Sequence, residues 1–304
     1  MANLKPTITV AVSAYNEQAN IKAFLESVLS QHEIGFKLKK IIVISDGSTD
    51  DTEKIVKSFR KTNIKLIAHR KRAGKSERLN EIYTALDSDI LVQSDCDVVF
   101  SHPKVIHDLI QPILKDKRIG MCGGNPKPLE AQTYLEKAVN YTCEAYGKFR
   151  SEVRGGDNLF SADGRLLAFR TSFIRFVRVP ADMIANDAFA YFCCLYKGYK
   201  YKYVQSATVW YRSPQTVADQ IRQNTRFLAA PIRLSKYFPR DLVERETKIP
   251  MRTYLLVMIK EFAKDPMLCL YIFLINKYCA FRARLLEGSF DSKWSMATTT
   301  KELA

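Results

Sequence analysis

Short apolar runs alternate with amphipathic segments along the N-terminal part of the chain. β-branched runs that predict strands occupy residues 7–13, 39–45, 64–68 and 89–95, and helical patterns occupy residues 21–31, 51–59 and 77–86. This alternation is typical of a parallel sheet that is covered by helices on both faces. Ligands of such sheets bind beyond the carboxyl ends of the strands. We therefore expect functional residues in the segments that follow the strands, which are residues 13–17, 46–50 and 95–97.

The pattern is less regular after residue 101. Helices are predicted over residues 103–114, 131–149 and 184–196, and strands over residues 118–126, 164–170 and 207–211. This region contains no internal repeat and no low-complexity linker. We therefore predict one continuous α/β domain over residues 1–230, followed by a separate C-terminal helical region over residues 231–304.

The C-terminal region has a different composition. Residues 253–264 can form a helix with a broad apolar face, Pro266 interrupts it, and the apolar run 267–275 follows. That run is much shorter than the roughly 20 residues needed to cross a bilayer. The cations interleaved with these apolar residues are Lys260, Lys264, Lys277, Arg282 and Arg284. We therefore predict amphipathic helices on an anionic membrane surface, although the same faces could instead pack on the domain or on a second subunit.

Charge and cysteine content bear on partners and compartment. The chain has 304 residues, and 47 Lys and Arg against 32 Asp and Glu give a net charge of +15, which favours an anionic partner. The sequence lacks a recognisable nucleic-acid-binding module, so no nucleic-acid partner is predicted. Seven cysteines without metal-site spacing, and an N-terminus without a secretory signal, predict a cytoplasmic protein with free thiols.

Two aspartates after the fourth predicted strand are candidates for metal binding. Asp95 and Asp97 project to the same side if the chain stays extended, because side chains alternate along a strand. Magnesium is commonly held by one or two carboxylates together with substrate phosphates, so this pair would bind a metal–diphosphate complex. Asp46 ends an earlier strand and should lie on the same rim. The alternative is that a D-x-D triplet at a strand end only caps a turn or a helix.

A basic segment precedes the third predicted helix. Residues 69–80 place Arg70, Lys71, Arg72, Lys75 and Arg78 around a glycine. Backbone at a glycine can approach a phosphate, and a helix N-terminus with nearby cations favours anions. The segment is therefore a candidate phosphate site, and the alternative is a solvated basic face.

An ordered set of short motifs resembles the signature elements of glycosyltransferase family 2. The motifs are SAYNE (13–17), SDGSTDDT (45–52), RAGKSERLN (72–80), SDCD (94–97), GRLLAFR (164–170), ND (186–187) and QNTRF (223–227). The resemblance covers roughly residues 7–227, and its strength lies in the order of the motifs. It implies an α/β GT-A fold, with a Rossmann-like, mostly parallel sheet flanked by helices. It also implies sugar transfer from a nucleotide diphosphate donor, often a UDP-sugar, with inversion at the anomeric carbon.

The resemblance also implies roles for individual residues. Residues 1–100 would form the nucleotide-sugar-binding half and residues 101–230 the acceptor-binding half. Asp97 would ligate Mg²⁺ or Mn²⁺, and Asp187 would be the general base that removes a proton from the acceptor hydroxyl. The residues on the donor side would be Ala14, Tyr15, Glu17, Asp46, Lys75, Asp95 and Arg226.

A second motif implies a membrane-associated branch of the family. Gln223, Arg226 and Phe227 match a Q-x-x-R-W element, with Phe in place of Trp. In that branch the Arg faces the donor diphosphate and the aromatic ring lies beside the acceptor sugar. Phe keeps the stacking face but lacks the indole N–H donor, which leaves the identity of the acceptor open. We expect a lipid-linked or glycolipid acceptor, met by a peripherally associated, monotopic enzyme at the cytoplasmic face of a membrane.

The choice of base rests on residues near the ND motif. Asn186 stands where many family members have Glu, so Asp187 lacks a like-charged neighbour that could raise its pKa. Asp182 is the nearest other acid, and we expect it to be a helix N-cap before Met183.

Other functions remain open on the sequence. The chain could be a soluble glycosyltransferase with a non-lipid acceptor, or a nucleotidyltransferase or an anionic-polymer-binding protein. The nucleotidyltransferase class is disfavoured because SAYNE follows the first predicted strand, where that class carries a glycine-rich signature.

Overall fold

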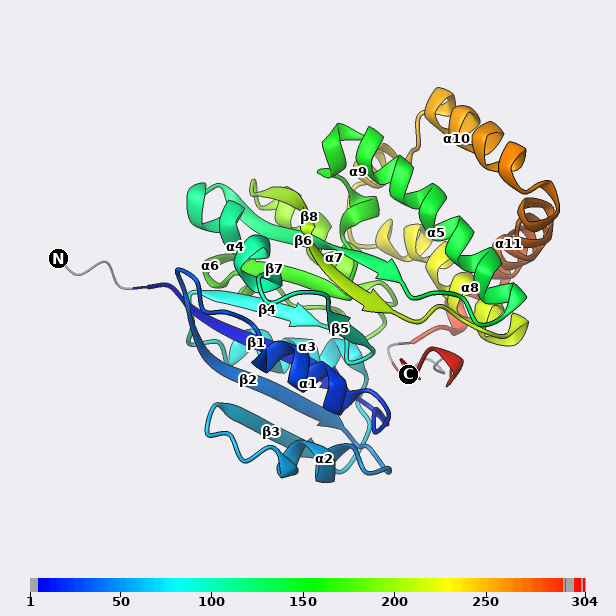
Figure 1. The fold of residues 1–304 in the computed structure, drawn as a ribbon. Coiled ribbons are helices and arrows are strands. Elements are labelled where there is room, and N and C mark those ends of the chain that lie inside the picture. Colours follow the sequence, from blue (N-terminus) through cyan, green and yellow to red (C-terminus); the bar gives the residue numbers. More distant parts are fainter. Residues whose placement is uncertain (1–4, 292, 294–297, 302, 304) are drawn as a thin grey trace.

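A computed structural model describes residues 5–291, 293, 298–301 and 303, which form one mixed sheet with helices on both faces (Figure 1). The strands lie in the order β3-β2-β1-β4-β7-β6-β8-β5. Four of the seven pairings are parallel, so the prediction of a mostly parallel α/β sheet is confirmed. The strands are β1 (Thr7–Ala14), β2 (Lys37–Asp46), β3 (Ile64–His69), β4 (Ile90–Ser94), β5 (Val98–Phe100), β6 (Ile119–Pro128), β7 (Leu166–Arg170) and β8 (Lys200–Tyr211).

The carboxyl ends of β1, β2 and β4 form the rim that the sequence predicts. These strands are largely buried runs of apolar residues, as expected for parallel strands that helices cover on both faces. β1 pairs in parallel with both β2 and β4. Their ends therefore bring the segments after Ala14, Asp46 and Ser94 to the same edge of the sheet.

Two hydrophobic cores fix the helices on the two faces of the sheet. One core includes residues of α1, α2 and α4, and the other includes residues of α3, α6 and α7. The helices on the sheet are α1 (Ile21–Leu29), α2 (Thr52–Ser58), α3 (Lys75–Thr84), α4 (Val105–Lys115), α6 (Thr171–Ile174) and α7 (Asn186–Tyr196).

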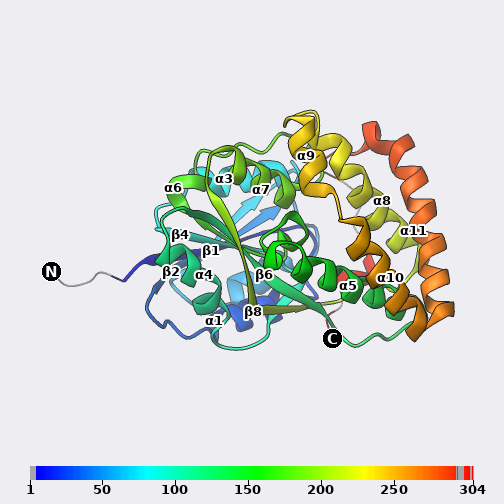
Figure 2. The same ribbon diagram turned by 90° about the horizontal axis from the view of Figure 1, so that it is seen from above.

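A group of helices lies beside the sheet, on the same side of the molecule in Figures 1 and 2. α11 continues well beyond the predicted apolar run, and the predicted domain boundary at residue 230 falls inside α8. Within the described part of the chain, no helix is long and apolar enough to span a membrane. The group consists of α5 (Tyr134–Glu152), α8 (Val217–Leu234), α9 (Arg240–Thr247), α10 (Met251–Lys264) and α11 (Pro266–Leu286).

Buried ion pairs tie these helices to the rest of the domain. Arg233 of α8 is 2% exposed and donates hydrogen bonds to the backbone oxygens of Asp182 and Glu287 and to the Glu287 carboxylate. Glu261 of α10 accepts a hydrogen bond from Lys148 of α5. Because unpaired buried charges are costly, these pairs hold α8, α10 and the end of α11 in fixed positions.

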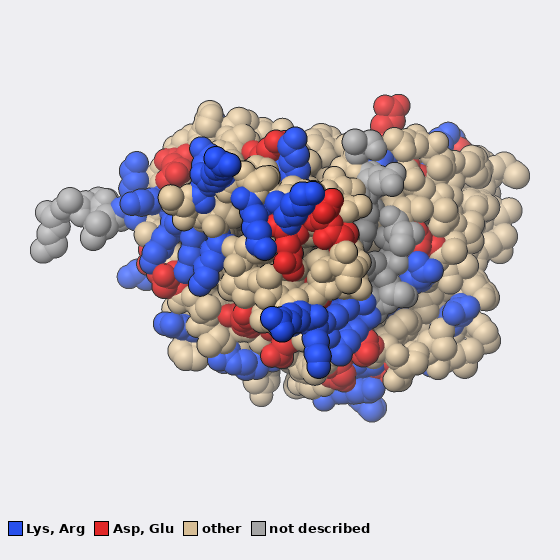
Figure 3. All heavy atoms as spheres, turned by 90° about the horizontal axis from the view of Figure 1, so that it is seen from below, with Lys and Arg blue, Asp and Glu red and all other residues tan. Residues whose placement is uncertain are grey.

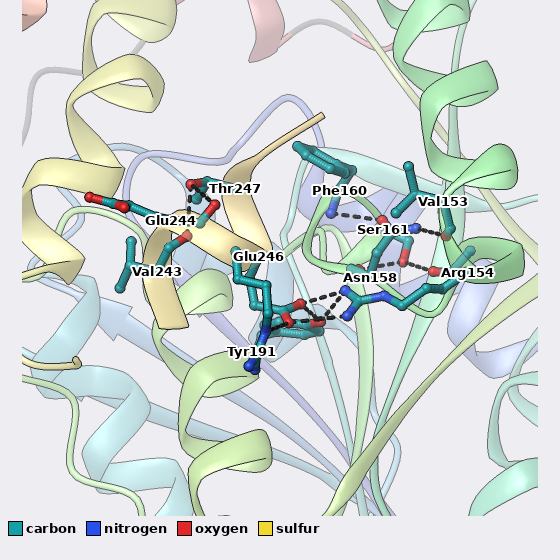
Figure 4. A network of polar contacts seen from close by, with 12 residues as sticks. Val153, Arg154, Asn158, Phe160, Ser161, Tyr191, Val243, Glu244, Glu246 and Thr247 are labelled. Carbon is teal, nitrogen blue, oxygen red and sulfur yellow. Dashed lines mark hydrogen bonds and ion pairs between the residues drawn. The ribbon is translucent and has the colours of Figure 1, made fainter. Parts of the chain in front are cut away.

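A third polar network holds α9 against α7 (Figure 4). The buried carboxylate of Glu246 accepts hydrogen bonds from Tyr191 Oη at 2.7 Å and from Arg154 Nη1 at 3.1 Å. α9 has few apolar positions, and only Val243 and Glu246 are buried. This network therefore supplies a large share of what fixes α9.

Candidate active site

A cavity of about 1460 Å³ opens at the rim formed by β1, β2 and β4. Ala14 is the one predicted site residue that does not line it, because its side chain is buried in the core, so that it could meet a ligand only through its backbone. The predicted site residues that line the cavity are Tyr15, Glu17, Asp46, Lys75, Asp95, Asp97, Asp187, Gln223, Arg226 and Phe227. The structure thus brings together residues that lie far apart in the sequence.

Asp46 organises the basic segment beside the cavity. Its Oδ1 accepts hydrogen bonds from Ala73 N at 2.8 Å and Arg78 Nε at 2.7 Å, and its Oδ2 accepts one from Gly74 N at 2.8 Å. Gly74 precedes α3 with a φ of +102°, which residues with a side chain rarely adopt. The carboxylate therefore fixes the turn that leads into α3, and its predicted role on the donor side stays a prediction.

The loops after β1 and β2 and the basic segment form one wall of the cavity. The Arg72 guanidinium lies over the ring of Tyr15, 4.1 Å from the ring centroid. Gly47 has a φ of +75°, and a Cβ there would lie 2.8 Å from the backbone nitrogen of Arg72. Glu17 is buried, and its backbone N–H donates to Thr52 Oγ1 at 2.8 Å. Glycine at position 47 therefore lets the basic segment approach the end of β2.

Lys75 and Asp95 form an ion pair at the start of α3. Burial alone would lower the pKa of Lys75, but the charge and hydrogen bond of Asp95 outweigh it and raise the pKa. Lys75 is also attracted by the charge of Asp187. The lysine therefore keeps its positive charge in a cavity that contains several carboxylates.

Asp97 has a raised pKa, caused first by burial and then by the charge of Asp95. Arg165 offsets this in part. That arginine packs over the ring of Tyr211, 3.7 Å from the centroid, and pairs with Asp163 at 2.9 Å. Arg165 lies within the GRLLAFR motif but is not among the predicted site residues.

The residues fit a divalent cation that is held together with phosphate. Among the residues that the structure describes, no three His, Cys, Asp or Glu side chains are grouped so that they could hold a metal ion. Asp95 and Asp97 supply the oxygen ligands that Mg²⁺ and Mn²⁺ prefer. A bound cation would offset the burial and the charge of Asp95, which together raise the pKa of Asp97. The remaining ligands would come from substrate phosphate and water.

Asp187 lies in the first turn of α7 and is held by backbone donors. Its Oδ2 accepts from Gly164 N at 3.1 Å, and its Oδ1 accepts from Ala188 N at 2.8 Å. Burial, followed by the charge of Asp163, raises the pKa of Asp187 above the ordinary value for Asp. A carboxylate with a fixed orientation and a raised pKa is suited to general-base catalysis.

α8 contributes Gln223, Arg226 and Phe227 to the cavity. Burial lowers the pKa of Arg226 to about 10, so the guanidinium remains charged at neutral pH. Its Nη1 donates to the backbone oxygen of Ile184 at 2.9 Å, and it packs over the ring of Phe227 at 4.8 Å. The charges of Asp187 and Asp95 both act on Arg226. The guanidinium therefore lies near the predicted base and near a carboxylate of the donor side.

The segment before α7 differs from the prediction. α7 begins at Asn186 with Ala185 as its N-cap, so the prediction that Asp182 is an N-cap is wrong. Asp182 instead accepts hydrogen bonds from Tyr237 and Arg233. Asn186 Oδ1 accepts from Ser76 Oγ at 3.2 Å, which joins the start of α7 to α3.

Aromatic residues on the far side of the cavity were also missed. Trp210, Tyr146 and Tyr254 line the cavity and are between 37% and 42% exposed. They come from β8, α5 and α10, so no local motif in the sequence joins them.

Comparisons with known proteins agree with this geometry. The profile of Glycosyl transferase family 2 matches residues 9–182. The poly-β-1,6-N-acetyl-D-glucosamine synthase of Staphylococcus epidermidis is 27% identical over 225 residues, which are 72% of this chain and 53% of that protein. The synthase of Staphylococcus aureus strain COL is 25% identical over 224 residues, again 72% and 53%. The chain thus spans about half the length of these curated relatives.

Two solved structures share the fold. The mannosyltransferase PcManGT from Pyrobaculum calidifontis, in complex with GDP-Man and Mn²⁺, aligns with a TM-score of 0.59 at 19% identity over 93% of this chain and 74% of that one. Glucosyl-3-phosphoglycerate synthase from Mycobacterium tuberculosis, in complex with Mn²⁺ and UDP-glucose, aligns with a TM-score of 0.51 at 17% identity over 75% and 78%. At these identities the likeness supports the GT-A fold alone. Because the family profile covers more than half of the chain, the protein belongs to glycosyltransferase family 2 and is a glycosyltransferase.

Proposed function

We propose that the protein transfers a sugar from a UDP-sugar to a hydroxyl group of a lipid-linked or glycolipid acceptor, with inversion and with Mg²⁺ or Mn²⁺. The observation that carries the proposal is that Asp95, Asp97, Asp187 and Arg226 line one cavity. Carboxylates with nearby cations suit a metal-bound diphosphate, and a separate carboxylate with a raised pKa suits a base.

In the proposed mechanism Asp187 accepts the proton of the acceptor hydroxyl as its oxygen attacks the anomeric carbon. The bond between that carbon and the UDP oxygen breaks on the opposite face, which inverts the configuration and leaves protonated Asp187 and free UDP. Lys75 and Arg226 offset the negative charge that develops on the diphosphate. A bound divalent cation would supply further charge neutralisation to the leaving group.

A donor screen tests the proposed reaction. UDP-N-acetylglucosamine is the first donor to try, because the curated relatives are named as poly-β-1,6-N-acetyl-D-glucosamine synthases. Release of UDP or GDP is measured from UDP-N-acetylglucosamine, UDP-glucose and GDP-mannose, with MnCl₂ or with EDTA. We expect release from one UDP-sugar and its loss in EDTA. Equal release in EDTA would overturn the metal role, and a preference for GDP-mannose would overturn the assignment of UDP.

The outward faces of α10 and α11 support the lipid part of the proposal. On α11 an apolar residue recurs every three or four positions, and each is between 47% and 72% exposed. These residues are Met267, Leu270, Leu274, Tyr278, Phe281 and Leu285. On α10 a similar stripe consists of Met251, Leu255, Ile259 and Phe262. A soluble monomer rarely exposes so large a continuous apolar surface, so we propose that it lies on a membrane.

The charges on these helices suit anionic headgroups. Within the described residues, the exposed charged side chains of α10 and α11 are all cationic, namely Arg252, Lys260, Lys264, Lys277 and Arg284. Glu261 is buried, and Asp265 is half-buried. The right-hand end of the molecule in Figure 3, where the C-terminal helices lie, is largely uncharged, with a few basic and acidic side chains on it. Apolar area with basic residues is the combination found in monotopic attachment to the cytoplasmic face of a membrane.

A further inference from the structure

The cavity continues past Asp187 into an apolar arm between α5, α10 and α11. The rim of the sheet contributes mostly charged side chains to the lining. The three helices contribute mainly aliphatic and aromatic ones, together with Glu144, Arg150, Glu261 and Lys277. The apolar residues that define the arm are Val139 and Phe149 of α5, Tyr254 and Met258 of α10, and Ile272 and Phe273 of α11. This arm is distinct from the outward faces of the same helices.

The volume of the cavity leaves space beyond the donor. Pockets for single small ligands usually measure about 300 to 1,000 Å³. The cavity here measures about 1460 Å³. A nucleotide-sugar at the rim would therefore leave the arm unfilled.

The arm is mainly apolar and open. Of the two acids that these helices contribute to the lining, Glu261 is paired with Lys148 and Lys264, and Glu144 is exposed. Phe149 and Tyr254 stack with an interplanar angle of 7° and a centroid distance of 6.1 Å. Tyr254 and Phe273 line the arm and are 38% and 40% exposed, so solvent reaches it. An occupant of the arm should therefore be a hydrocarbon chain and not a second polar substrate.

Neighbouring residues on each helix allow the arm and the outward face to be tested separately. Met258 lines the arm, whereas Ile259 is 65% exposed on the outward stripe. In the same way Phe273 lines the arm and Leu274 lies on the outward stripe at 59% exposed. Successive residues of a helix point in directions about 100° apart, so each pair compares the arm with the outward face on one helix.

We propose that the apolar arm binds the hydrocarbon chain of the acceptor while the acceptor hydroxyl lies at Asp187. This inference rests on the proposed function, which places an amphiphilic acceptor at this site. The continuity of the arm with the cavity that contains Asp187 identifies the occupant as the acceptor's own chain and not a separate lipid. The outward apolar stripes of α10 and α11, together with the exposed cations Arg252, Lys260 and Arg284, would hold the membrane from which that chain enters.

Binding of two chain lengths tests the arm without requiring sugar transfer. The probes are butyl and octyl β-glucoside, used below the concentration at which micelles form and measured by isothermal titration calorimetry. Burial of each methylene tightens binding about fourfold, so we expect octyl glucoside to bind at least about a hundredfold more tightly. Met258→Gln and Phe273→Gln should remove most of this preference, whereas Ile259→Gln and Leu274→Gln should keep it. Equal affinity for both probes in the wild type would overturn the proposal.

A photoreactive octyl glucoside with a terminal diazirine locates the chain by mass spectrometry. We expect labelled residues on the arm, at Met258 or Phe273. Labelling confined to the outward stripe, or an equal loss of preference in all four variants, would overturn the arm as the chain site. Failure of the proposed function would give a different result: no donor would release its nucleotide in the donor screen, and this outcome does not depend on how the two glucosides bind.

Discussion

Asp187 sets the acid limit of the proposed reaction. Burial and the charge of Asp163 raise its pKa above the ordinary 3.8, and only the deprotonated carboxylate can accept a proton. The rate of transfer should therefore fall as pH drops through this raised pKa, at a higher pH than for an exposed aspartate. Measurement of kcat between about pH 4 and pH 8 checks this. A rate that is flat down to the ordinary range of Asp would contradict the base role.

Asp46 should matter for stability as well as for donor binding. Asp46→Asn removes the charge that compensates buried Arg78. The NH₂ group of the asparagine would also face the N–H of Gly74, so that two donors would meet. We expect a loss of about 2–4 kcal/mol in the free energy of unfolding, moderated because Glu81 also contacts Arg78. Urea denaturation measures it, with Asp51→Asn as the control at an exposed position. An unchanged midpoint for Asp46→Asn would show that the carboxylate is not structural.

Strand positions predicted some of the site residues, whereas Asp187, Arg226 and their neighbours in α7 and α8 were predicted only from the ordered motifs. Asp46, Asp95 and Asp97 were found because parallel strands bring such positions to one rim. Arg165 could not be found in this way, because it precedes β7, and only the antiparallel pairing of β7 with β4 brings that end of the strand to the rim. Strand orientation of that kind depends on long-range packing and leaves no local pattern.

At the scale of elements, the Glu246 network should make stability depend on pH. Burial would raise the pKa of Glu246, but hydrogen bonds from Arg154 and Tyr191 outweigh it and lower the pKa below 4.5. The stabilisation is therefore fully present above the unfolded-state value of 4.5 and is lost as pH falls through the lowered folded value.

Glu246→Gln measures this contribution. We expect it to cost about 1–3 kcal/mol at pH 7, because a buried acceptor of charged hydrogen bonds is replaced by an amide. The difference from wild type should shrink below pH 4.5, as followed by thermal unfolding in buffers of stepped pH. Glu244→Gln, on the exposed side of the same helix, serves as the control. A deficit that is the same at every pH would rule out the proposed linkage.

The elements themselves were predictable where apolar periodicity was strong. α1, α4 and α7 follow the predicted ranges closely, since one face of each is buried in a core. α9 was not predicted as an individual helix because RDLVERET has almost no apolar stripe. The ion pair of Glu246 with Arg154 and its hydrogen bond from Tyr191 hold the helix instead. β5 was missed because it has three residues and depends on pairing with β8.

At the scale of the whole molecule, the outward stripe of α10 and α11 should bind anionic vesicles. Association should increase with the fraction of phosphatidylglycerol in phosphatidylcholine vesicles and decrease with salt, because both apolar burial and cations contribute. Leu274→Glu should weaken binding by about tenfold or more, since it places a charge where an apolar side chain would be buried. Flotation in a density gradient provides the measurement.

Phe176→Glu is the matched control for vesicle binding. Phe176 is 68% exposed, comparable to Leu274, but it follows α6, which lies at the opposite end of the molecule from α10 and α11 (Figures 1 and 2). The Phe176→Glu variant should float with vesicles as the wild type does. Equal losses in both variants, or no association of the wild type, would argue against the membrane surface. A dimer detected by light scattering that Leu274→Glu dissociates would assign the stripe to a second copy of the chain.

The most direct test of the central claim compares Asp187→Asn with Asp97→Asn in the same assay. Sugar transfer and Mn²⁺-dependent UDP binding are measured for both variants and the wild type. We predict that Asp187→Asn binds UDP as the wild type does but transfers no sugar, whereas Asp97→Asn loses both metal-dependent binding and transfer. Full transfer by Asp97→Asn, or loss of UDP binding together with transfer in Asp187→Asn, would contradict the division of roles between metal ligand and base.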